Sequence, residues 1–497
     1  MHHDRKEALA MTALPIPSQV HHRYADVDGV TVFYREAGPA DAPTVLLLHG
    51  FPSASHQYRR LIEVLAARYH VIAPDYPGFG FTEAPDSFVY SFDGLADTIE
   101  KFTDVLGLRR YALYLFDFGG PVGLRLAERR PERVTGLIVQ NANAYAEGLS
   151  ELAQGMIANR PGVPGAEDQV RGILTAAVTR GQYEGGTADV SRVDPAGWTL
   201  DQHFLDQPGR EAAQIALALD YGSNVEAYPR WQQYLREHRP PALVLWGRND
   251  AFFPESGAYA YQTDLPDAEV HVFDTGHFAL EEALPEMVPL IDAFLARLPR
   301  RIAVVGAGGR LGGAVAREVA ERGHRLTPLG RSTMDVTDPD SVATAVAGHD
   351  AVVVAIKGED SLVPRGAQAL LDGLGRAGVR RLVFVGGGGS LRDPAGQRFV
   401  DSPQFPAMYL QTARDQAEAL DLLRASTGPV SWTYVSPPPV HLVEGPRTGD
   451  YLVEARDTPI VGASGESRVS IPDFAAAVVD AAETGRFDRQ RVTVAYA

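Results

Sequence analysis

The chain of 497 residues contains no cysteine. It therefore forms no disulfide, offers no thiolate nucleophile and has no cysteine ligands for zinc. A chain without cysteine fits a reducing compartment, and we expect a cytoplasmic protein. The sequence also lacks any run approaching the roughly 18 apolar residues that a membrane span needs. Residues 1–19 have no apolar segment typical of a secretion signal.

Excess positive charge is absent as well. Lysine and arginine together number 46, against 63 aspartate and glutamate residues, and the net charge is −17. A chain with no basic field does not gather phosphates, so we expect neither nucleic acid nor an anionic membrane as a partner. Hydrophobic residues at 45% and charged residues at 22% are typical of a globular protein. The length predicts two or three domains.

From about Tyr24, strand-like and helix-like segments alternate. The segment ADVDGVTVFYREAG has a DG turn between two alternating runs, which predicts a hairpin. The segment APTVLLLHG is a continuous apolar run typical of a strand buried on both faces. Strand alternating with helix predicts a parallel sheet covered by helices. We expect this α/β unit to span residues 22–298, after a flexible N-terminus at residues 1–21.

The alternation is interrupted at about residues 144–238, where helical pieces follow one another without a strand, and we predict an inserted helical cap. A second pattern of strand, glycine-rich turn and helix begins directly after Pro299 and Arg300. Residues 301–497 are therefore predicted to form a second α/β unit, with a Rossmann-like parallel sheet. So short a junction implies a fixed mutual orientation of the two units.

The segment LYLFDFGGPVG, at residues 113–123, ends a predicted strand with one acidic residue, Asp117, before the glycines. A sharp turn from strand to helix is the pattern of a nucleophile elbow, which exposes its residue at the carboxyl edge of a sheet. Gly119 and Gly120 allow the close backbone approach that this turn needs. An aspartate that stands alone at a helix start is more typical of an N-cap. The prediction of a nucleophile therefore depends on the motifs that accompany Asp117.

Four further motifs stand in a fixed order around this turn: HGFP at 49–52, PDYPGFG at 74–80, WGRND at 246–250 and DTGHF at 274–278. With them, residues 22–298 resemble the α/β-hydrolase fold. The resemblance is to the branch with an aspartate nucleophile, which includes epoxide hydrolases and haloalkane and haloacetate dehalogenases. The order of nucleophile, acid and histidine is that of this fold.

The resemblance implies a role for each residue of the site. The carboxylate of Asp117 attacks a saturated carbon and forms an alkyl ester on the enzyme. His277 is the general base that activates water for hydrolysis of the ester, and Asp250 orients it. The backbone amides of Phe51 and Phe118 stabilise the tetrahedral intermediate. We expect a small apolar electrophile as substrate, with neither a metal nor a cofactor in this unit.

Halide-binding residues are missing around the predicted nucleophile. Haloalkane dehalogenases usually hold the halide with a polar residue just after the HG pair and a tryptophan just after the nucleophile. This chain has Phe51 and Phe118 in these places. Haloacetate dehalogenases carry arginines close after the nucleophile, whereas the first arginine after Asp117 is Arg125.

Epoxide hydrolases donate to the epoxide oxygen from tyrosines of the cap, and Tyr221 in LALDYGSN lies where one of them is expected. Tyr183 is a candidate for the second. A cap tyrosine is equally consistent with pocket lining, and Leu115 and Phe116 depart from the Gly-His that usually precedes an epoxide hydrolase nucleophile. We therefore predict epoxide opening, with haloalkane or haloacid dehalogenation as the alternative.

In the second unit, VVGAGGRLGG places glycines between a strand and a helix, where a pyrophosphate sits against backbone N–H groups. A purely structural turn is the alternative, and the surrounding βαβ pattern favours nucleotide binding. Arg331 follows the next strand and suits the 2′-phosphate of NADP, and Asp335 is expected near the adenine. The predicted cofactor-binding residues of the turn are Gly306, Gly309, Arg310, Leu311 and Gly312.

Residues 301–497 resemble the atypical short-chain dehydrogenases of the NmrA-like and biliverdin-reductase-B-like or flavin-reductase-like group, through VFVGGGGSL, TYVSPP and SRVSIPDFAAAVVD. The Tyr-x-x-x-Lys pair of short-chain dehydrogenases is absent, because Tyr409 is followed four residues later by Ala413. The resemblance implies either hydride transfer to a flavin or quinone or a cofactor-binding sensor.

Together these patterns predict a bifunctional chain, a hydrolase with an aspartate nucleophile joined to an NADP-binding, reductase-like unit. The rival hypotheses are a mainly redox protein, whose first unit only shapes an interface, and a redox sensor without catalysis. A further hypothesis, suggested by the short junction, is that the two sites act on successive intermediates of one pathway. No pattern predicts the oligomeric state.

Overall fold

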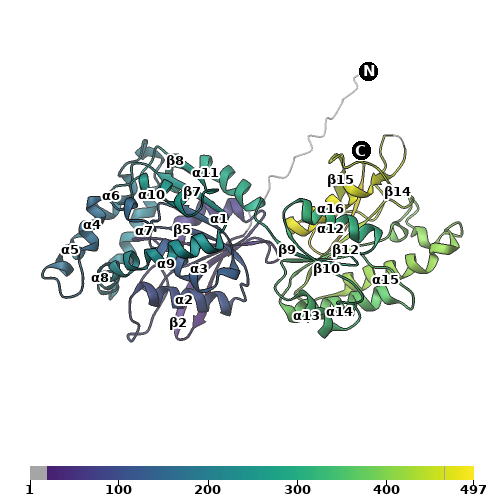
Figure 1. Ribbon diagram of the computed structural model, residues 1–497, viewed down its shortest axis with the longest axis horizontal. Helices are drawn as coiled ribbons and strands as arrows, with labels where there is room; N and C mark the ends of the chain where they lie inside the picture. The colour runs from purple at the N-terminus through teal and green to yellow at the C-terminus, as the bar shows by residue number, and fades with distance from the viewer. Residues whose placement is uncertain (1–18, 464) are drawn as a thin grey trace, which may run out of the picture.

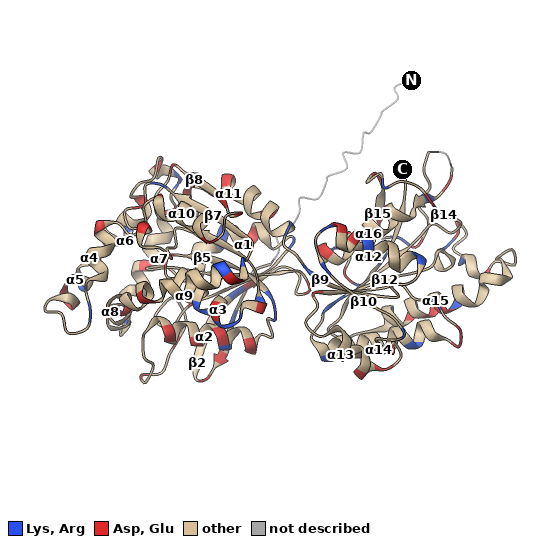
Figure 2. Cartoon of the chain, in the orientation of Figure 1, with Lys and Arg blue, Asp and Glu red and all other residues tan. Residues whose placement is uncertain are grey.

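The computed structural model describes residues 19–463 and 465–497 and forms two α/β units, each built around its own sheet (Figure 1). The predicted flexible N-terminus falls mostly on residues 1–18, which lie outside the described residues. The first strand begins at His21. Acidic and basic residues are mixed over both units (Figure 2). In the described part of the chain, no helix has the length and apolar character needed to cross a bilayer.

The first sheet has eight strands in the order β1-β2-β4-β3-β5-β6-β7-β8. β1 and β2 form the predicted hairpin, with positive φ at Asp28 (53°) and Gly29 (86°). β2 is also antiparallel to β4, and all later neighbours are parallel. The strands are β1 (His21–Val27), β2 (Val30–Ala37), β3 (Thr44–Leu48), β4 (His70–Pro74), β5 (Tyr111–Phe116), β6 (Val134–Gln140), β7 (Ala242–Gly247) and β8 (Glu269–Phe273).

Helices cover both faces of this sheet, which explains the continuous apolar runs of its central strands. Every residue of β5 and of β7 is buried, as expected of parallel strands packed on two sides. The covering helices are α1 (Arg59–Leu65), α2 (Phe92–Val105), α3 (Gly119–Arg129), α10 (Ser256–Ala260) and α11 (Ala279–Ala296). The fold is therefore that of the α/β hydrolases, with the carboxyl ends of the strands at one edge.

Helices α4 to α9 lie between β6 and β7, and the described chain forms no strand between them. In Figure 1 they cover the end of the first unit that lies away from the second. Arg59 of α1 ties them to the sheet unit, because it pairs with Asp194 and with Glu281 at 2.9 Å each. The cap helices are α4 (Glu151–Ile157), α5 (Ala166–Ile173), α6 (Ala176–Glu184), α7 (Pro195–Leu205), α8 (Arg210–Asp220) and α9 (Gly222–His238).

The second sheet has seven strands in the order β10-β9-β11-β12-β13-β17-β15, all parallel except the pair β15 and β17. A separate pair joins β14 (His441–Val443) to β16 (Arg468–Ser470). The strands of the large sheet are β9 (Arg301–Val305), β10 (Arg325–Leu329), β11 (Ala351–Val354), β12 (Arg381–Val385), β13 (Ser431–Ser436), β15 (Leu452–Glu454) and β17 (Gln490–Ala495). Its helices are α12 (Arg310–Glu321), α13 (Pro339–Val346), α14 (Leu362–Ala377), α15 (Leu410–Ala425) and α16 (Ile471–Thr484).

The two units meet through the amino ends of their strands. Arg110, directly before β5, pairs with Asp350, directly before β11. Asp41, in the loop before β3, lies 3.5 Å from Arg381, the first residue of β12. The carboxyl edges of both sheets, where sites form in α/β folds, therefore face away from the junction.

Candidate active site and nucleotide site

The turn after β5 has the geometry of a nucleophile elbow. β5 ends at Phe116 and α3 begins at Gly119, so only two residues make the turn. Asp117 adopts a left-handed backbone conformation, with φ at 47°. A Cβ atom on Gly119 would lie 2.1 Å from the Leu48 carbonyl oxygen, so only glycine fits against β3. The turn thus holds the Asp117 side chain at the carboxyl edge of the sheet.

The Asp117 carboxylate accepts hydrogen bonds from the backbone amides of the two residues predicted to form the oxyanion site. The Phe51 amide donates to Asp117 Oδ1 at 2.6 Å. Burial raises the pKa of Asp117, while the positive charge of His277 and the backbone amides of Phe51 and Phe118 oppose that shift. The same amides would face negative charge that develops at this carboxyl group.

His277 lies between two carboxylates at the same edge. Its Nδ1 is 2.6 Å from Asp250 Oδ2, and its Nε2 is 3.8 Å from Asp117 Oδ2. Burial alone would lower the pKa of His277, but the charge and hydrogen bond of Asp250, followed by the charge of Asp117, raise it above its ordinary value. The Nδ1 hydrogen bond leaves Nε2 facing Asp117, which is the arrangement that a general base for ester hydrolysis requires.

Asn141 belongs to this site, and the sequence analysis missed it. It follows β6 with φ at 42°, and its Nδ2 donates to Asp250 Oδ2 at 2.9 Å. Its Oδ1 accepts from the Gly247 amide at 2.9 Å, which fixes the amide group in place. The polar QNAN ending of an otherwise apolar strand was the available signal, because such endings lie at the carboxyl edge of a parallel sheet.

A cavity of about 530 Å³ opens over this edge, lined by both the sheet unit and the cap. Its walls are mostly apolar, a composition common among small-molecule sites. Among the described residues that line it, none is lysine or arginine. Five predicted site residues line it (Phe51, Asp117, Phe118, Tyr221 and His277), together with residues that include Met156, Ile173, Leu174, Gln182, Gln214, Phe252 and Phe253.

Tyr221 lies at the start of α9, with its ring 5.8 Å from that of Phe118. Its hydroxyl has no protein hydrogen-bond partner within the described part of the chain, although Tyr221 lines the cavity with Asp117. Burial, followed by the neighbouring Tyr228 and Asp117, raises the pKa of Tyr221 well above its ordinary value. Tyr221 is therefore protonated at neutral pH and can act as a donor.

The suggestion that Tyr183 is a second donor is wrong. Tyr183 is fully buried, stacks on Phe278 at 3.8 Å and donates to Asp201 Oδ2 at 2.6 Å. It does not line the cavity, whereas the preceding residue, Gln182, does. In a helix, neighbouring residues point in different directions, so a shift of one position exchanges a cavity residue for a core residue.

Arg125 likewise does not line the cavity. Its guanidinium is buried, pairs with Asp93 at 2.6 Å, donates to Asn224 at 2.7 Å and lies over the Trp231 ring. These contacts anchor α3 to α2 and α9. Arg125 is therefore not available to clamp a substrate carboxylate next to Asp117.

In the second unit, the turn between β9 and α12 forms an open cradle at a helix N-terminus. Gly306 has φ at 84°, and a Cβ there would meet the Ala355 carbonyl oxygen at 2.3 Å. A Cβ on Gly312 would meet the Gly306 oxygen at 2.0 Å. Added Cβ atoms at Gly308 would meet nothing within 4 Å, and at Gly309 only the Gly306 oxygen, at 3.3 Å. The backbone is thus exposed for a phosphate group at the start of α12.

The other predicted cofactor residues lie at the start of α12 and in the segment after β10. Arg310 opens α12 and pairs with Glu444 at 2.6 Å, and Leu311 packs partly against the core. Arg331, just after β10, is exposed and makes no ion pair among the described residues. Asp335 Oδ1 accepts hydrogen bonds from the Thr337 amide and hydroxyl, so one of its oxygens already stabilises the turn before α13.

Two family models match the chain in the same two places. The model described as "alpha/beta hydrolase fold" matches residues 43–284, and the model described as "NAD(P)H-binding" matches residues 306–483. A nucleotide cofactor in the second unit follows from the latter match and fits the exposed cradle at α12.

Three relatives match one unit each. An uncharacterised hydrolase of Saccharomyces cerevisiae is 43% identical over 52% of this chain and 91% of its own. Haloalkane dehalogenase 2 of Mycobacterium tuberculosis is 30% identical over 52% of this chain and 90% of its own. An uncharacterised protein of Bacillus subtilis, YwnB, is 35% identical over 39% of this chain and 97% of its own. The chain therefore belongs to the α/β-hydrolase-fold family through its first unit and to the NAD(P)H-binding family through its second.

Proposed function

We propose that the first unit opens epoxides with Asp117 as nucleophile and releases a diol. The observation that carries this proposal is the set of polar groups around the cavity. Asp117, His277 and the unpartnered hydroxyl of Tyr221 line one apolar space. The side chains at the two halide-binding positions are the rings of Phe51 and Phe118, which have no N–H donor. One neutral hydroxyl is enough to donate a proton to an epoxide oxygen. It does not take the place of the two donors that hold a leaving halide.

The first chemical step forms an ester. An oxygen of the ionised Asp117 attacks one epoxide carbon, the carbon–oxygen bond of the ring breaks, and the freed oxygen takes the proton of the Tyr221 hydroxyl. The raised pKa of Tyr221 keeps that proton in place until the ring opens. The product of this step is an alkyl ester on Asp117.

The second step hydrolyses this ester. His277 Nε2 takes a proton from a water molecule, and the resulting hydroxide attacks the carboxyl carbon of Asp117. The amides of Phe51 and Phe118 stabilise the oxyanion, and the alkoxide leaves with the proton from His277. Departure of the alcohol leaves Asp117 as a carboxylic acid, and its proton passes through water to the Tyr221 phenolate. Asp117 is thereby ionised again, and one epoxide and one water give one diol.

Intact mass spectrometry of the His277→Gln variant tests this scheme. The variant retains the nucleophile but has no base, so it should accumulate an adduct equal to a whole epoxide, mapped to Asp117. Asp117→Asn is the matched control and should form no adduct. A His277→Gln variant that stays unmodified across a broad panel of epoxides would contradict the proposal.

Dehalogenation is the second candidate, because the relative from Mycobacterium tuberculosis is named a haloalkane dehalogenase. It predicts an adduct on Asp117 that lacks the halogen when haloalkanes are supplied. Haloacids are a poorer fit, since no lysine or arginine occurs among the described residues lining the cavity. Intact mass spectrometry of the His277→Gln variant therefore distinguishes epoxide opening from dehalogenation.

For the second unit we propose NADP as the cofactor, with Arg331 contacting the 2′-phosphate and Asp335 near the adenine. Bound NADPH supplies a hydride, and its acceptor would be a flavin or quinone because no Tyr-x-x-x-Lys pair is present. Arg331→Ala should raise the Kd of NADPH about tenfold and leave the Kd of NADH unchanged. Equal weakening of both cofactors would contradict this role. Tight NADPH binding without oxidation by any flavin or quinone would favour the redox sensor.

We also propose the division of the chain into residues 22–298, with a cap at about 144–238, and residues 301–497. The separate sheets and cores of the two units support it. A cytoplasmic location and a small apolar electrophile as the substrate of the first unit belong to the same proposal.

A further inference from the structure

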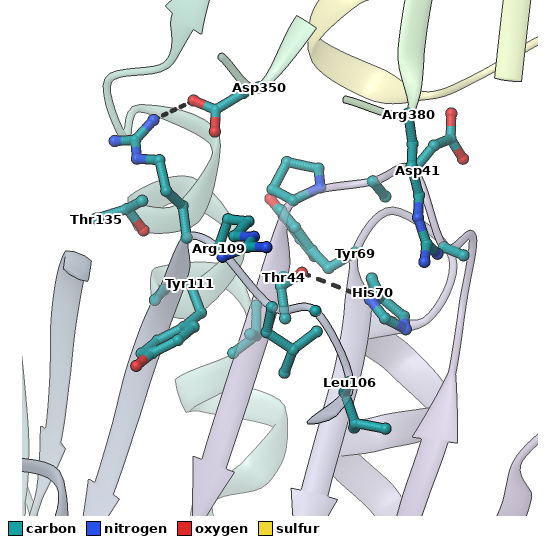
Figure 3. Close-up of a pocket in the computed structure, with 18 of the residues that line it drawn as sticks. Asp41, Thr44, Tyr69, His70, Leu106, Arg109, Tyr111, Thr135, Asp350 and Arg380 are labelled. Carbon is teal, nitrogen blue, oxygen red and sulfur yellow. Dashed lines mark hydrogen bonds and ion pairs between the residues drawn. The ribbon is translucent and has the colours of Figure 1, made fainter. Parts of the chain in front are cut away.

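A second cavity of about 530 Å³ lies between the two units, away from both carboxyl edges. Its walls are the loops that lead into the strands, including Pro43, Thr44 and Arg109 to Tyr111 of the first unit, and Gly348 to Asp350 and Ala377 to Arg380 of the second. Figure 3 shows Arg109 and Arg380, one from each unit, among the side chains that line it. We call this space the junction cavity.

Each carboxylate in the wall of the junction cavity already has a cationic partner. Glu36 pairs with Arg23 at 2.9 Å and with His70 at 2.8 Å. Asp350 pairs with Arg110, and Asp41 lies 3.5 Å from the buried Arg381. The acidic lining is thus neutralised by groups of the protein itself.

Three arginines of the lining are left without a partner. Arg109 and Arg380 are exposed, Arg300 is half-buried, and none of them makes an ion pair among the described residues. Glu483 and Asp350 are the carboxylates whose negative charge favours the charged form of the Arg300 guanidinium. Glu483 is already bound by Arg322 at 2.7 Å and Asp350 by Arg110, so neither neutralises Arg300.

This excess of positive charge is unusual in a chain with a net charge of −17. A concave space with charges of one sign on its walls concentrates the field inside it. The planar guanidinium group binds phosphate through two parallel hydrogen bonds, which makes arginine the preferred side chain for that group. The chemistry of the lining therefore selects an anion with several oxygens.

The remaining walls suit the organic part of such an anion. Tyr34, Tyr69, Leu106, Leu108 and Leu298 line the same space. The volume lies within the range of about 300–1,000 Å³ that small-molecule sites occupy. We propose that the junction cavity binds a small organic phosphate, with its phosphate groups between Arg109, Arg300 and Arg380. This site is distinct from the glycine-rich cradle, because it lies at the opposite ends of the strands of the second sheet.

Isothermal titration of the full chain with ATP, without magnesium and with NADPH at saturation, tests the proposal. NADPH occupies the glycine-rich cradle, so the remaining heat reports a second site. We expect ATP to bind under these conditions, and inorganic pyrophosphate to compete with it. The double variant Arg109→Ala/Arg380→Ala should raise the Kd of ATP at least tenfold. Both side chains are exposed, so the variant should fold normally, which its thermal unfolding verifies.

Arg239→Ala is the control, because Arg239 is an exposed arginine after α9 that does not line the junction cavity. It should leave the Kd of ATP unchanged. Three results would each overturn the proposal: no ATP binding in the presence of NADPH, an unchanged Kd in the double variant, or equal weakening in the control. Anomalous scattering from a thiophosphate analogue soaked into crystals gives an independent readout, and its peak should lie between Arg109 and Arg380.

Discussion

At the scale of single residues, removal of the Tyr221 hydroxyl tests epoxide opening against dehalogenation, because only epoxide opening uses this hydroxyl as a proton donor in the proposed mechanism. Tyr221→Phe keeps the ring that packs against Phe118 and removes only the donor. We expect kcat/KM for a small epoxide to fall about 100-fold, the lower part of the range for loss of a general acid. Steady-state assays with a terminal epoxide measure this change.

Tyr183→Phe is the matched control for this prediction. Tyr183 is also a buried cap tyrosine, but its hydroxyl is bound to Asp201 and does not line the cavity. Its loss should cost about 1–3 kcal/mol of stability, because a buried carboxylate loses a hydrogen bond, and should leave kcat/KM nearly unchanged. If Tyr183→Phe lowered kcat/KM as much as Tyr221→Phe, the tyrosines would act through cap packing and the assigned role of Tyr221 would be wrong.

In the proposed mechanism, His277 sets the pH dependence of ester hydrolysis. The base must be neutral, and its pKa is raised above the ordinary value, mainly by Asp250 against the opposing effect of burial. Hydrolysis should therefore be slow below the pKa and rise as pH increases through it. Asp250→Asn removes the largest upward contribution, so the midpoint should move to lower pH while the maximal rate falls. Single-turnover decay of the ester at a series of pH values measures both.

Asp274→Asn controls for a general change in charge near the histidine. Asp274 is an exposed carboxylate three residues before His277, held by Asn249 at 3.0 Å. This variant should keep the wild-type midpoint. The role of Asp250 in raising the pKa of His277 would be ruled out by either of two results. One is a midpoint that moves to higher pH in Asp250→Asn, and the other is an equal movement of the midpoint in Asp274→Asn.

At the scale of elements, the elbow depends on the close approach of α3 to β3. In Gly119→Ala, the new Cβ would lie 2.1 Å from the Leu48 carbonyl oxygen, a backbone atom that cannot move alone. We expect a loss of about 1–3 kcal/mol in the stability of the first unit, as for other overpacked sites. Turnover should fall as well, because Asp117 precedes the displaced helix. Differential scanning calorimetry measures the thermal unfolding transition of the first unit in the variant and in the wild type.

Gly181→Ala is the corresponding control. Gly181 lies in α6, where a Cβ would meet nothing within 4 Å. Alanine in an open helix position should stabilise by about 0.5–1 kcal/mol. A Gly119→Ala protein as stable as the wild type would show that the elbow tolerates a side chain.

Local patterns predicted most elements because the physics that forms them is local. The DG turn gave the β1–β2 hairpin, the apolar run ending at Phe116 gave β5, and the glycines from Gly306 gave the turn before α12. β15 was not predicted, since three residues with two exposed side chains leave no pattern. Its place depends on pairing with β17, a contact between distant segments.

The candidate site was predictable only where a motif carried it. Asp117, Asp250 and His277 each follow a strand in a recognisable motif, and the structure brings them within hydrogen-bonding or near-contact distance. Asn141 was indicated by the polar QNAN ending of β6, a signal that lies outside the quoted motifs. The separation of Tyr183 from Tyr221 was not predictable, because it depends on which way a side chain points once the cap has packed, and a single sequence does not record that direction.

At the scale of the whole molecule, the two units are joined at the amino ends of their strands, as the Arg110–Asp350 pair shows. Both candidate sites lie at the opposite, carboxyl ends. Strands of five or six residues rise about 3.3 Å per residue, so the two sites are roughly 35–40 Å apart on opposite sides of the molecule. The short junction therefore does not bring the two sites together, and the hypothesis that they act on successive intermediates stays a prediction.

Sites held this far apart should work independently. We expect saturating NADPH to change kcat/KM for epoxide opening by less than about twofold, and Asp117→Asn to change the Kd of NADPH by less than about twofold, since neither ligand distinguishes two states of the other unit. Fluorescence titration and steady-state assays of the full chain measure both quantities. Because binding linkage is reciprocal, an epoxide analogue that tightened NADPH binding tenfold would have to be tightened tenfold by NADPH. Such a result would mean that the junction transmits a conformational change, and the contacts Arg110–Asp350 and Asp41–Arg381 would be the first positions to test for it.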